Sequence, residues 1–414
     1  MLSILLYLWI IFISFGPAYN LVGDWGVFSA MAMIVLSSRH ITIEKKITAC
    51  IVAFGTFIAY KAVTIGNSQA ISVFHSAYGV VNTAIKLLIF IFMLQTIAPL
   101  CEQRKDILAR LFNFCFHFSI VLSIIVLFRA GRNTYRYETG AGGLLLAPQI
   151  YITVTIFVIM GLVYLLLKSK KKRVLRITLI LLDIIYLYMA NYTTQLLFAF
   201  LGIVIVIAMG SKMKKKNRII TMFFLGIIIM VTIPILPEFI RLVSETFFAT
   251  NEIVKTRLEE LALLLQGGNI QGTDLKFRFD LMSRSFSAFL HDSIFGVPFS
   301  HYNTIDTGWI IGGHSEWFDD LARYGIVGMI FFCLFLYRSY QMVFKPLGNA
   351  VELKKALLLI GLLYGFANPL VRYMEFEFLY IIILMTEYYY CQERIEAEHV
   401  VYSKLNSIVG VKAI

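Results

Sequence analysis

The polar segment 277–328 gathers the side chains of this chain that are best suited to proton transfer and to anion binding. It contains Arg278, Arg284 and His314, and two glycines directly precede His314. An imidazole can take a proton from a hydroxyl near neutral pH. The planar fork of a guanidinium binds two phosphate oxygens at once. We therefore expect the chemistry of this chain to lie here, with His314 as a candidate base and the arginines as candidate ligands of an anion.

Other side chains of this segment compete for these roles or have structural explanations. A histidine at the start of a helix can simply bond a backbone group, which is the alternative for His314. His291 and His301 are weaker candidates for the base, because no glycines precede them. Asp319 and Asp320 resemble a metal-binding pair, but consecutive helical residues point about 100° apart. We interpret the two as a solvated helix face and predict no metal.

The two arginines lie on a predicted helix that begins at Thr273 or Asp274 and ends near residue 290. Asp274 precedes Arg278 by four residues, so the two can form an ion pair on the helix surface. The same spacing relates Asp280 to Arg284, where we give the ion pair more weight. The side chains expected to form the buried side are Leu275, Phe279, Met282, Phe286 and Phe289.

The composition of the chain is that of a membrane protein. Hydrophobic residues make up 59% of it and charged residues only 15%, and the mean hydropathy is +0.78. Apolar runs near the length of a membrane span alternate with basic loops. Backbone groups in lipid must bond within their own segment, so these spans must be helices. The fold class is therefore all-α, a polytopic integral membrane protein with about twelve transmembrane helices.

The helices form one predicted membrane domain, 1–414, with one large insertion. A long loop at 237–320 separates the ninth and tenth spans, and it should fold into helices, the first of which begins near Asn251. The predicted spans are 2–18, 21–37, 47–65, 77–99, 111–130, 149–167, 177–192, 194–210, 219–236, 321–340, 356–370 and 377–391.

The basic residues predict the orientation. Lysines and arginines gather in the loops near 39–46, 104–110, 168–176, 212–218 and 338–355. The positive-inside rule places these loops and both termini in the cytoplasm, and the loop 237–320 outside. The net charge of +12 thus reports topology, although the lysines can also touch anionic lipid. We predict no nucleic-acid partner.

The five cysteines suggest neither a disulfide framework nor a cofactor site. They fall in predicted spans or at cytoplasmic span ends, and none lies in the long outer loop. No CxxC pair and no Cys/His cluster is present in the sequence. We therefore predict no cofactor.

The residues around the candidates form a recognisable pattern. Arg278 is followed by a turn at 291–296 that is similar to the form (D/N)xP(I/L)xG, by the glycine-rich approach to His314, and by a helix that reads YGIVG at 324–328. Together with the spans and the long late loop, this pattern resembles the superfamily of O-antigen polymerases and O-antigen ligases, the Wzy-type integral membrane glycosyltransferases. Two departures are Ser293, where the family usually has proline, and Ser315, where asparagine is common.

The resemblance implies a metal-independent glycosyltransferase of the bacterial plasma (inner) membrane. It implies polymerisation of repeat units of O-antigen or capsule on the outer face of that membrane. A glycan would move from one undecaprenyl-diphosphate-linked chain to an acceptor sugar hydroxyl. His314 would be the base, and Arg278 and Arg284 would hold the diphosphate. The implied partners are the lipid-linked oligosaccharide, membrane lipids, and a chain-length regulator and flippase of the same pathway.

The resemblance adds two cationic candidates. Many members of the family carry an arginine before a glycine in the other sizeable outer loop, and Arg136 fits that position, with Arg132 as its competitor. Lys86 lies well inside the fourth predicted span, where a charge calls for a reason. It either joins the diphosphate site or pairs with Asp183 of the seventh span.

Three further features bear on substrate contact. Trp317 either stacks on a sugar ring or belongs to the aromatic belt at the membrane surface. Lys61 lies close enough to a span end to extend its ammonium toward water. The outer turn at 191–195 has no arginine, whereas related proteins often have Ser-Arg there, so that contact is absent or replaced.

Two other functions remain open. The same chemistry serves an O-antigen ligase, which transfers finished glycan to a lipid A core. A membrane transporter or flippase of lipid-linked sugars is the alternative from another class. A transporter places its charged substrate residues near the middle of the bilayer, whereas most of the polar candidates in this chain lie in the outer loop.

Overall fold

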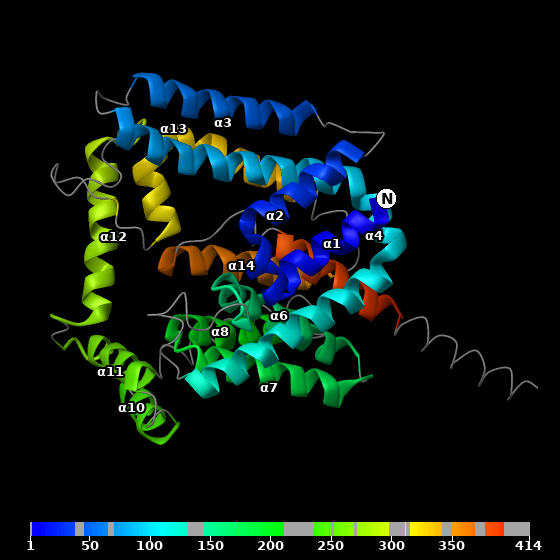
Figure 1. The fold of residues 1–414 in the computed structure, drawn as a ribbon. Helices are drawn as coiled ribbons and strands as arrows, with labels where there is room; N and C mark the ends of the chain where they lie inside the picture. Colours follow the sequence, from blue (N-terminus) through cyan, green and yellow to red (C-terminus); the bar gives the residue numbers. More distant parts are fainter. Residues whose placement is uncertain are drawn as a thin grey trace, which may run out of the picture.

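The computed structural model of the chain describes residues 2–37, 45–64, 70–130, 145–169, 171–210, 236–247, 249, 252–268, 271–297, 311, 315–341, 350–368 and 377–392. Helices are the only regular elements of this described part, which confirms the all-α class (Figure 1). The helices are α1 (Leu2–Ser14), α2 (Gly16–Ser37), α3 (Lys45–Thr64), α4 (Ala70–Ala130), α6 (Ile150–Lys168), α7 (Arg173–Met189), α8 (Thr193–Gly210), α10 (Leu236–Phe247), α11 (Glu252–Leu265), α12 (Asp274–His291), α13 (Glu316–Ser339) and α14 (Val351–Ala367).

The described helices follow the predicted spans closely. Residues 377–392 are also helical, and each predicted span overlaps a described helix; of the span 219–236, only residue 236, the start of α10, is described. The fourth and fifth spans are joined in α4, which Figure 1 draws as two arms that meet at a sharp bend. By length and composition, five described helices can cross a membrane: α2, the stretch Gln103–Arg129 of α4, α6, α8 and α13.

The helix α6 lies at the centre of the bundle and is buried along nearly its whole length. Its sequence is apolar on every side, which is the pattern of a helix enclosed by other helices. It packs against α7, α8 and α14. By contrast, α7 leaves Leu181 and Ile185 about half exposed on its outer side. In a membrane protein such apolar side chains face lipid, so exposure costs them little.

Helix ends that are predicted to face the same side of the membrane meet in the structure. Near the starts of α6 and α8 and the end of α14, the hydroxyl of Tyr364 lies 3.0 Å from Thr153 Oγ1 and accepts a 2.8 Å hydrogen bond from Gln195 Nε2. At the opposite ends, Tyr164 of α6 donates to Glu352 of α14 at 3.4 Å. The predicted alternation of the loops between two sides is therefore consistent with the packing.

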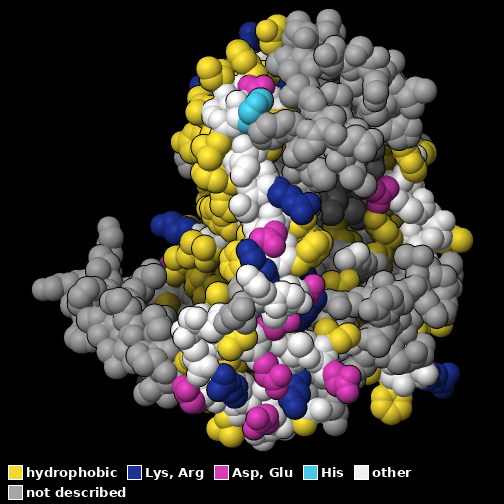
Figure 2. Space-filling model, turned by 90° about the vertical axis from the view of Figure 1, so that its left-hand side faces the viewer, with side chains coloured by type: hydrophobic (Ala, Val, Ile, Leu, Met, Phe, Trp, Pro, Cys, Tyr) yellow, Lys and Arg dark blue, Asp and Glu magenta, His cyan; other side chains and the backbone are white. Residues whose placement is uncertain are grey.

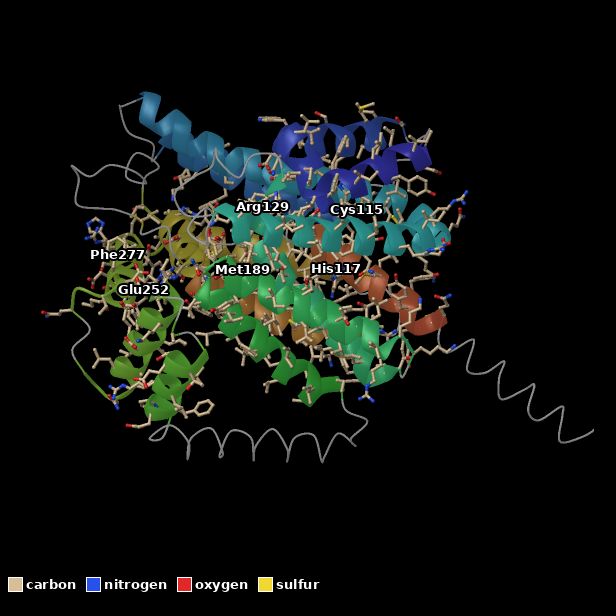
Figure 3. All side chains as sticks on the ribbon, turned by 60° about the horizontal axis from the view of Figure 1, so that its bottom comes forward. Cys115, His117, Arg129, Met189, Glu252 and Phe277 are labelled. Carbon is tan, nitrogen blue, oxygen red and sulfur yellow. The ribbon has the colours of Figure 1, made fainter. Side chains whose placement is uncertain are left out.

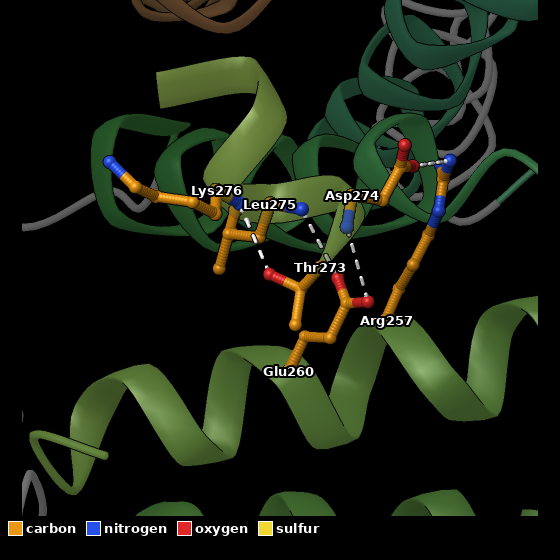
Figure 4. Close-up of polar contacts among 6 residues, drawn as sticks. All are labelled: Arg257, Glu260, Thr273, Asp274, Leu275 and Lys276. Atoms are coloured by element: carbon orange, nitrogen blue, oxygen red, sulfur yellow. Dashed lines mark hydrogen bonds and ion pairs between the residues drawn. The ribbon is translucent and has the colours of Figure 1, made fainter. Parts of the chain in front are cut away.

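Within the polar loop, the start of α12 is attached to α11 by several polar contacts, and we call this junction the pinned corner. Thr273 caps α12 by accepting a hydrogen bond from the Lys276 amide at 3.2 Å. The carboxylate of Glu260 on α11 accepts from the amides of Asp274 and Leu275, at 3.4 and 3.2 Å (Figure 4). Arg257 of α11 forms an ion pair with Asp274. These contacts fix the start of α12 to α11, and the predicted start of this helix is confirmed.

The predicted buried side of α12 is only partly right: Phe289 packs against the core, and the ring of Phe286 lies 5.9 Å from that of Phe318 on α13. Leu281, Ser285 and Ala288 are the residues of α12 that become buried, whereas Phe279 and Phe286 remain 44% and 42% exposed. The small side chains allow α12 to approach α13 closely.

Candidate functional site

The helix α12 and the first part of α13 lie side by side and run in the same direction. The hydroxyl of Ser285 donates to Asp319 Oδ1 at 2.5 Å. Further along both segments, the amide of Val297 donates to the carbonyl of Ala322 at 2.8 Å. Because the contacts occur in the same order on both segments, the segments are parallel, as Figure 1 also shows. The first half of α12 therefore lies toward the end at which α13 begins.

Arg278 lies on the face of α12 that is turned toward α13. It precedes Ser285 by seven residues, which is about two helical turns, so the two share a face. Its position is about 10 Å from that of Ser285 along the helix, in the direction of the start of α13. The predicted pair with Asp274 does not form, because Arg257 occupies that carboxylate. Within the described residues, Arg278 has no ion pair.

Arg284 is exposed on α12. Its predicted partner, Asp280, instead accepts a 2.6 Å hydrogen bond from Lys276 Nζ on the same helix. No acidic group of the described residues pairs with Arg284. Asp274 and Asp280, the predicted ion-pair partners of Arg278 and Arg284, thus pair with other basic side chains. Both guanidinium groups remain available to an anionic ligand.

The start of α13 is acidic and buried. Ser315 caps the helix by accepting a 3.5 Å hydrogen bond from the Phe318 amide. Glu316, Asp319 and Asp320 follow it, and all three are buried. A negative charge is stabilised near a helix N-terminus by the free backbone amides and the helix dipole. His314 lies outside the described residues, but it is bonded directly to Ser315.

The prediction of a solvated face at Asp319 and Asp320 is wrong, since these residues are only 2% and 0% exposed. The hydroxyl of Ser285 supplies a partner to Asp319. The guanidinium of Arg323 lies 3.8 Å from Asp320. Packing of α12 against α13 provides this burial, and no local pattern reports it. Among the described residues, no group of three His, Cys, Asp or Glu side chains could hold a metal ion.

Trp317 anchors the first turn of α13 to α14. Its indole Nε1–H donates a 2.7 Å hydrogen bond to the carbonyl of Leu362. The ring lies against Gly365, where an added Cβ would come within 2.6 Å of Trp317 Nε1. Ser315 makes a second link, a 3.4 Å hydrogen bond from its hydroxyl to the Gly365 carbonyl. The indole is partly exposed, so one side of it remains free for contact.

Next to Gly365 lies a network of polar side chains that the sequence analysis did not predict. Tyr364 adjoins Gly365 and joins Thr153 to Gln195. Gln195 lies in the outer turn where related proteins often carry an arginine, and its partner is the hydroxyl of Tyr364 on α14. Nearby, the buried hydroxyl of Thr193 has no hydrogen-bond partner among the described residues. The signal available in the sequence is a set of polar side chains within otherwise apolar spans.

Lys61 is buried, which contradicts the prediction that it extends toward water. Its side chain is 0% exposed, and Nζ donates to the carbonyl of Phe295 at 3.0 Å and to that of Arg323. These carbonyls lie in the turn after α12 and within α13. The ammonium satisfies protein acceptors there and therefore does not need water.

Two of the predicted cationic ligands are not tested by the structure. Arg136 lies outside the described residues, and so does the side chain of Lys86, although α4 includes that position. The described partner of Asp183 is His117 of α4, with 3.5 Å between Asp183 Oδ2 and His117 Nε2. Figure 3 shows His117 within the bundle and Phe277 of α12 well apart from it. The buried pair is therefore separate from the site.

Figure 2 views the face that carries α10, α11 and α12. Acidic and basic side chains are interspersed over its lower part, whereas hydrophobic side chains cover one flank of its upper part. The exposed hydrophobic side chains of α12 include Phe277, Phe279, Phe286 and Leu290. The face thus presents charged groups beside apolar ones.

The fold and the site define a multi-pass α-helical membrane protein with an arginine-bearing polar loop packed on its helix ends. Residues 178–333 match the family model described as O-antigen ligase. The matched segment contains Arg278, the turn at 291–296 and the first part of α13. The resemblance to the superfamily of O-antigen ligases and polymerases is thereby confirmed. No curated protein and no solved structure matches the chain.

Proposed function

We propose that the protein polymerises polyprenyl-diphosphate-linked oligosaccharide repeat units of O-antigen or capsule on the outer face of the bacterial plasma membrane. The observation that carries the proposal is the position of Arg278. This residue has no ion pair within the described residues, and it lies on the α13-facing side of α12, toward the helix start that directly follows His314. In this proposal the phosphate ligand and the base act at the same end of α12 and α13.

The donor contacts follow from the chemistry of the leaving group. A lipid diphosphate gains negative charge as the bond to the sugar breaks, so fixed cations lower the barrier. Arg278 binds the diphosphate through its guanidinium fork, and Arg284 contributes a second positive charge. Arg136 and Lys86 complete the cationic site from the other outer loop and from α4. The exposed phenylalanines of α12 border the path of the polyprenyl tail.

The acceptor is activated by His314. Its imidazole takes the proton of an acceptor sugar hydroxyl while that oxygen bonds to the anomeric carbon of the donor. The bond between this carbon and the diphosphate oxygen breaks, and the diphosphate leaves with the electron pair. Trp317 offers the partly exposed side of its ring to a sugar. These groups need no metal, because arginines neutralise the leaving group.

The proposed orientation places both termini in the cytoplasm and the loop 237–320 outside. The lipid-linked repeat unit would then reach the site from the outer leaflet, after a flippase has delivered it. A chain-length regulator acting on the same product would contact the outer surface. Both partners follow from the proposed reaction, which needs a supply of repeat units and an end point.

The second candidate function is that of an O-antigen ligase, which the description of the matching family model favours. Deletion of the gene, followed by electrophoresis of the surface glycan, separates the two functions. Loss of a polymerase leaves a single repeat unit on the lipid core. Loss of a ligase leaves polymer on its undecaprenyl carrier and no surface ladder. Wild-type glycan in the deletion strain contradicts both candidates.

A further inference from the structure

The turn that follows α12 docks against α13 at a kink. We call residues 292–297 and 322–327 together the turn–kink junction. The amide of Val297 donates to Ala322 O at 2.8 Å, and the amide of Ile326 donates to Ser293 O at 2.8 Å. The amide of Val327 donates to the carbonyl of residue 294 at 3.1 Å. Hydrogen bonds in both directions fix the two backbones in register.

Two glycines make this close approach possible. Gly325 interrupts the helical dihedrals of α13 with a φ of 59°, and Gly296 in the turn has a φ of 75°. A Cβ on Gly296 would lie 2.6 Å from the carbonyl oxygens of Ala322 and Arg323. A Cβ on Gly325 would lie 2.4 Å from the carbonyl oxygen of Ile294. Any side chain at either position would therefore force the two backbones apart.

Lys61 of α3 joins both halves of this junction. Its ammonium donates to Phe295 O in the turn, at 3.0 Å, and to Arg323 O next to the kink. Burial of a charge is costly unless fixed partners replace water. The turn and the kink each supply a carbonyl partner to the ammonium. A neutral side chain at position 61 would not require such partners.

From this arrangement we propose that Lys61 is a positioning residue, which clamps the turn after α12 to the kink of α13 and so fixes the spacing between Arg278 and Ser315 at the start of α13. The inference rests on the roles that the proposed function gives to Arg278 and to His314, the residue bonded to Ser315. Lys61 itself touches neither substrate. It acts through the two helix segments that leave the junction in the direction of the site.

The geometry makes the site sensitive to the junction. The helical path from Gly325 back to Ser315 is about 15 Å, and that from Asp292 back to Arg278 is about 21 Å. A tilt of about 5° at the junction would move the far ends by roughly 1–2 Å. A displacement of about 1 Å can reduce a rate by roughly a hundredfold. A loosened clamp should therefore slow transfer while leaving each separate substrate contact intact.

The test compares Lys61→Met, which lacks donors, with Lys61→Gln, whose amide can donate to two carbonyls. Lys46→Met is the control, because Lys46 is an exposed lysine on the same helix. Purified enzymes receive lipid-linked repeat units, and kcat and the KM for this donor are measured. We expect Lys61→Met to lower kcat by about tenfold to a hundredfold with KM within about twofold. Lys61→Gln should be intermediate and Lys46→Met unchanged.

A second readout is independent of activity. Ser293→Cys and Ile326→Cys, in a background without native cysteines, should form a disulfide, because their backbones are hydrogen-bonded at 2.8 Å. Lys61→Met should lower the yield of this cross-link, and Lys46→Met should not. If the Lys61→Met protein is absent from the membrane, the kinetic constants and the cross-link yield are measured on Lys61→Gln instead.

The possible failures are distinguishable. If the unmodified protein makes no polymer, the proposed function fails, and the cross-link still tests the clamp. If the Lys61 variants keep wild-type kcat and wild-type cross-linking, the clamp is overturned. A donor KM that rises in step with the fall in kcat also overturns it, because Lys61 would then act in donor binding.

Discussion

The hydroxyl of Ser285 on α12 donates a 2.5 Å hydrogen bond to the buried carboxylate of Asp319 on α13. We expect Ser285→Ala to lower the free energy of unfolding by about 1 kcal/mol, because a buried hydrogen bond is lost. Thermal unfolding in detergent measures the effect. Ser283→Ala, at an exposed position of the same helix, is the control. Equal midpoints for the two variants would show that the hydrogen bond contributes nothing.

Arg278 should be essential for glycan extension. Arg278→Ala is expected to abolish polymer formation at a normal level of protein in the membrane. Arg278→Lys should restore only part of the activity, since an ammonium cannot make the two-pronged phosphate contact. Polymer length on a gel and protein level by immunoblot report both quantities. Arg241→Ala on α10, at an exposed arginine bonded to Gln266, serves as the control.

Either of two results would change the assignment of Arg278. An active alanine variant removes this residue from the site. A fully active lysine variant means that positive charge suffices and that the planar fork is unnecessary.

His314→Ala should lower the turnover of the purified enzyme by roughly 100- to 10,000-fold, the usual contribution of a positioned general base. Binding of the lipid-linked donor should survive, because the diphosphate is held by arginines. His291→Ala is the matched control at an exposed position. A dead His291 variant beside an active His314 variant would mean that the wrong histidine was chosen.

The two glycines Gly325 and Gly361 should respond differently to alanine. At Gly325 the φ is positive, and a Cβ would lie 2.4 Å from the carbonyl oxygen of Ile294. At Gly361 on α14, nothing lies within 4 Å of such a Cβ. Gly325→Ala should thus destabilise the protein by roughly 1–3 kcal/mol or more. Gly361→Ala should be neutral or mildly stabilising. Size-exclusion profiles and unfolding midpoints compare the two, and a well-folded Gly325→Ala protein would contradict the packing.

The loop that carries α10 to α12 should be accessible from outside the cell. A cysteine at Gln271, an exposed position, should react with a membrane-impermeant thiol reagent in intact spheroplasts. A cysteine at Lys171, in the predicted cytoplasmic run, should react only after permeabilisation. Both are placed in a background without native cysteines. The reverse labelling pattern would invert the proposed topology and remove the proposed access to outer-leaflet substrate.

Local sequence rules located the elements that carry the site, because those rules describe local physics. The capping oxygen of Thr273 and the length of each apolar run predict where helices begin and end. The position of Arg278 on a helix followed from such signals. The buried residues of that helix did not, because contact with α13 selects Leu281, Ser285 and Ala288. Phe279 and Phe286, which were assigned to the buried side, stay partly exposed.

Long-range partners account for the other errors. Asp319 is buried by contact with a serine 34 residues earlier in the chain. Lys61 is buried because it reaches the carbonyl of Arg323, 262 residues further on. Nothing in the neighbourhood of either residue in the sequence reports such a contact. Both are polar side chains whose role becomes visible only once the helices are packed.

The pinned corner at Thr273 has a consequence for how this segment can diversify. Before it, α10 and α11 pack mainly on each other; after it, α12 and α13 are held in register by backbone contacts at Gly296 and Gly325. Insertions, deletions or exchanges in α10 that leave Arg257 and Glu260 of α11 in place would remodel the outer surface without changing the position of α12. The same changes between Arg257 and Gly325 would shift α12 relative to α13. The segment thus separates an exchangeable part from a part whose spacing is fixed by its contacts.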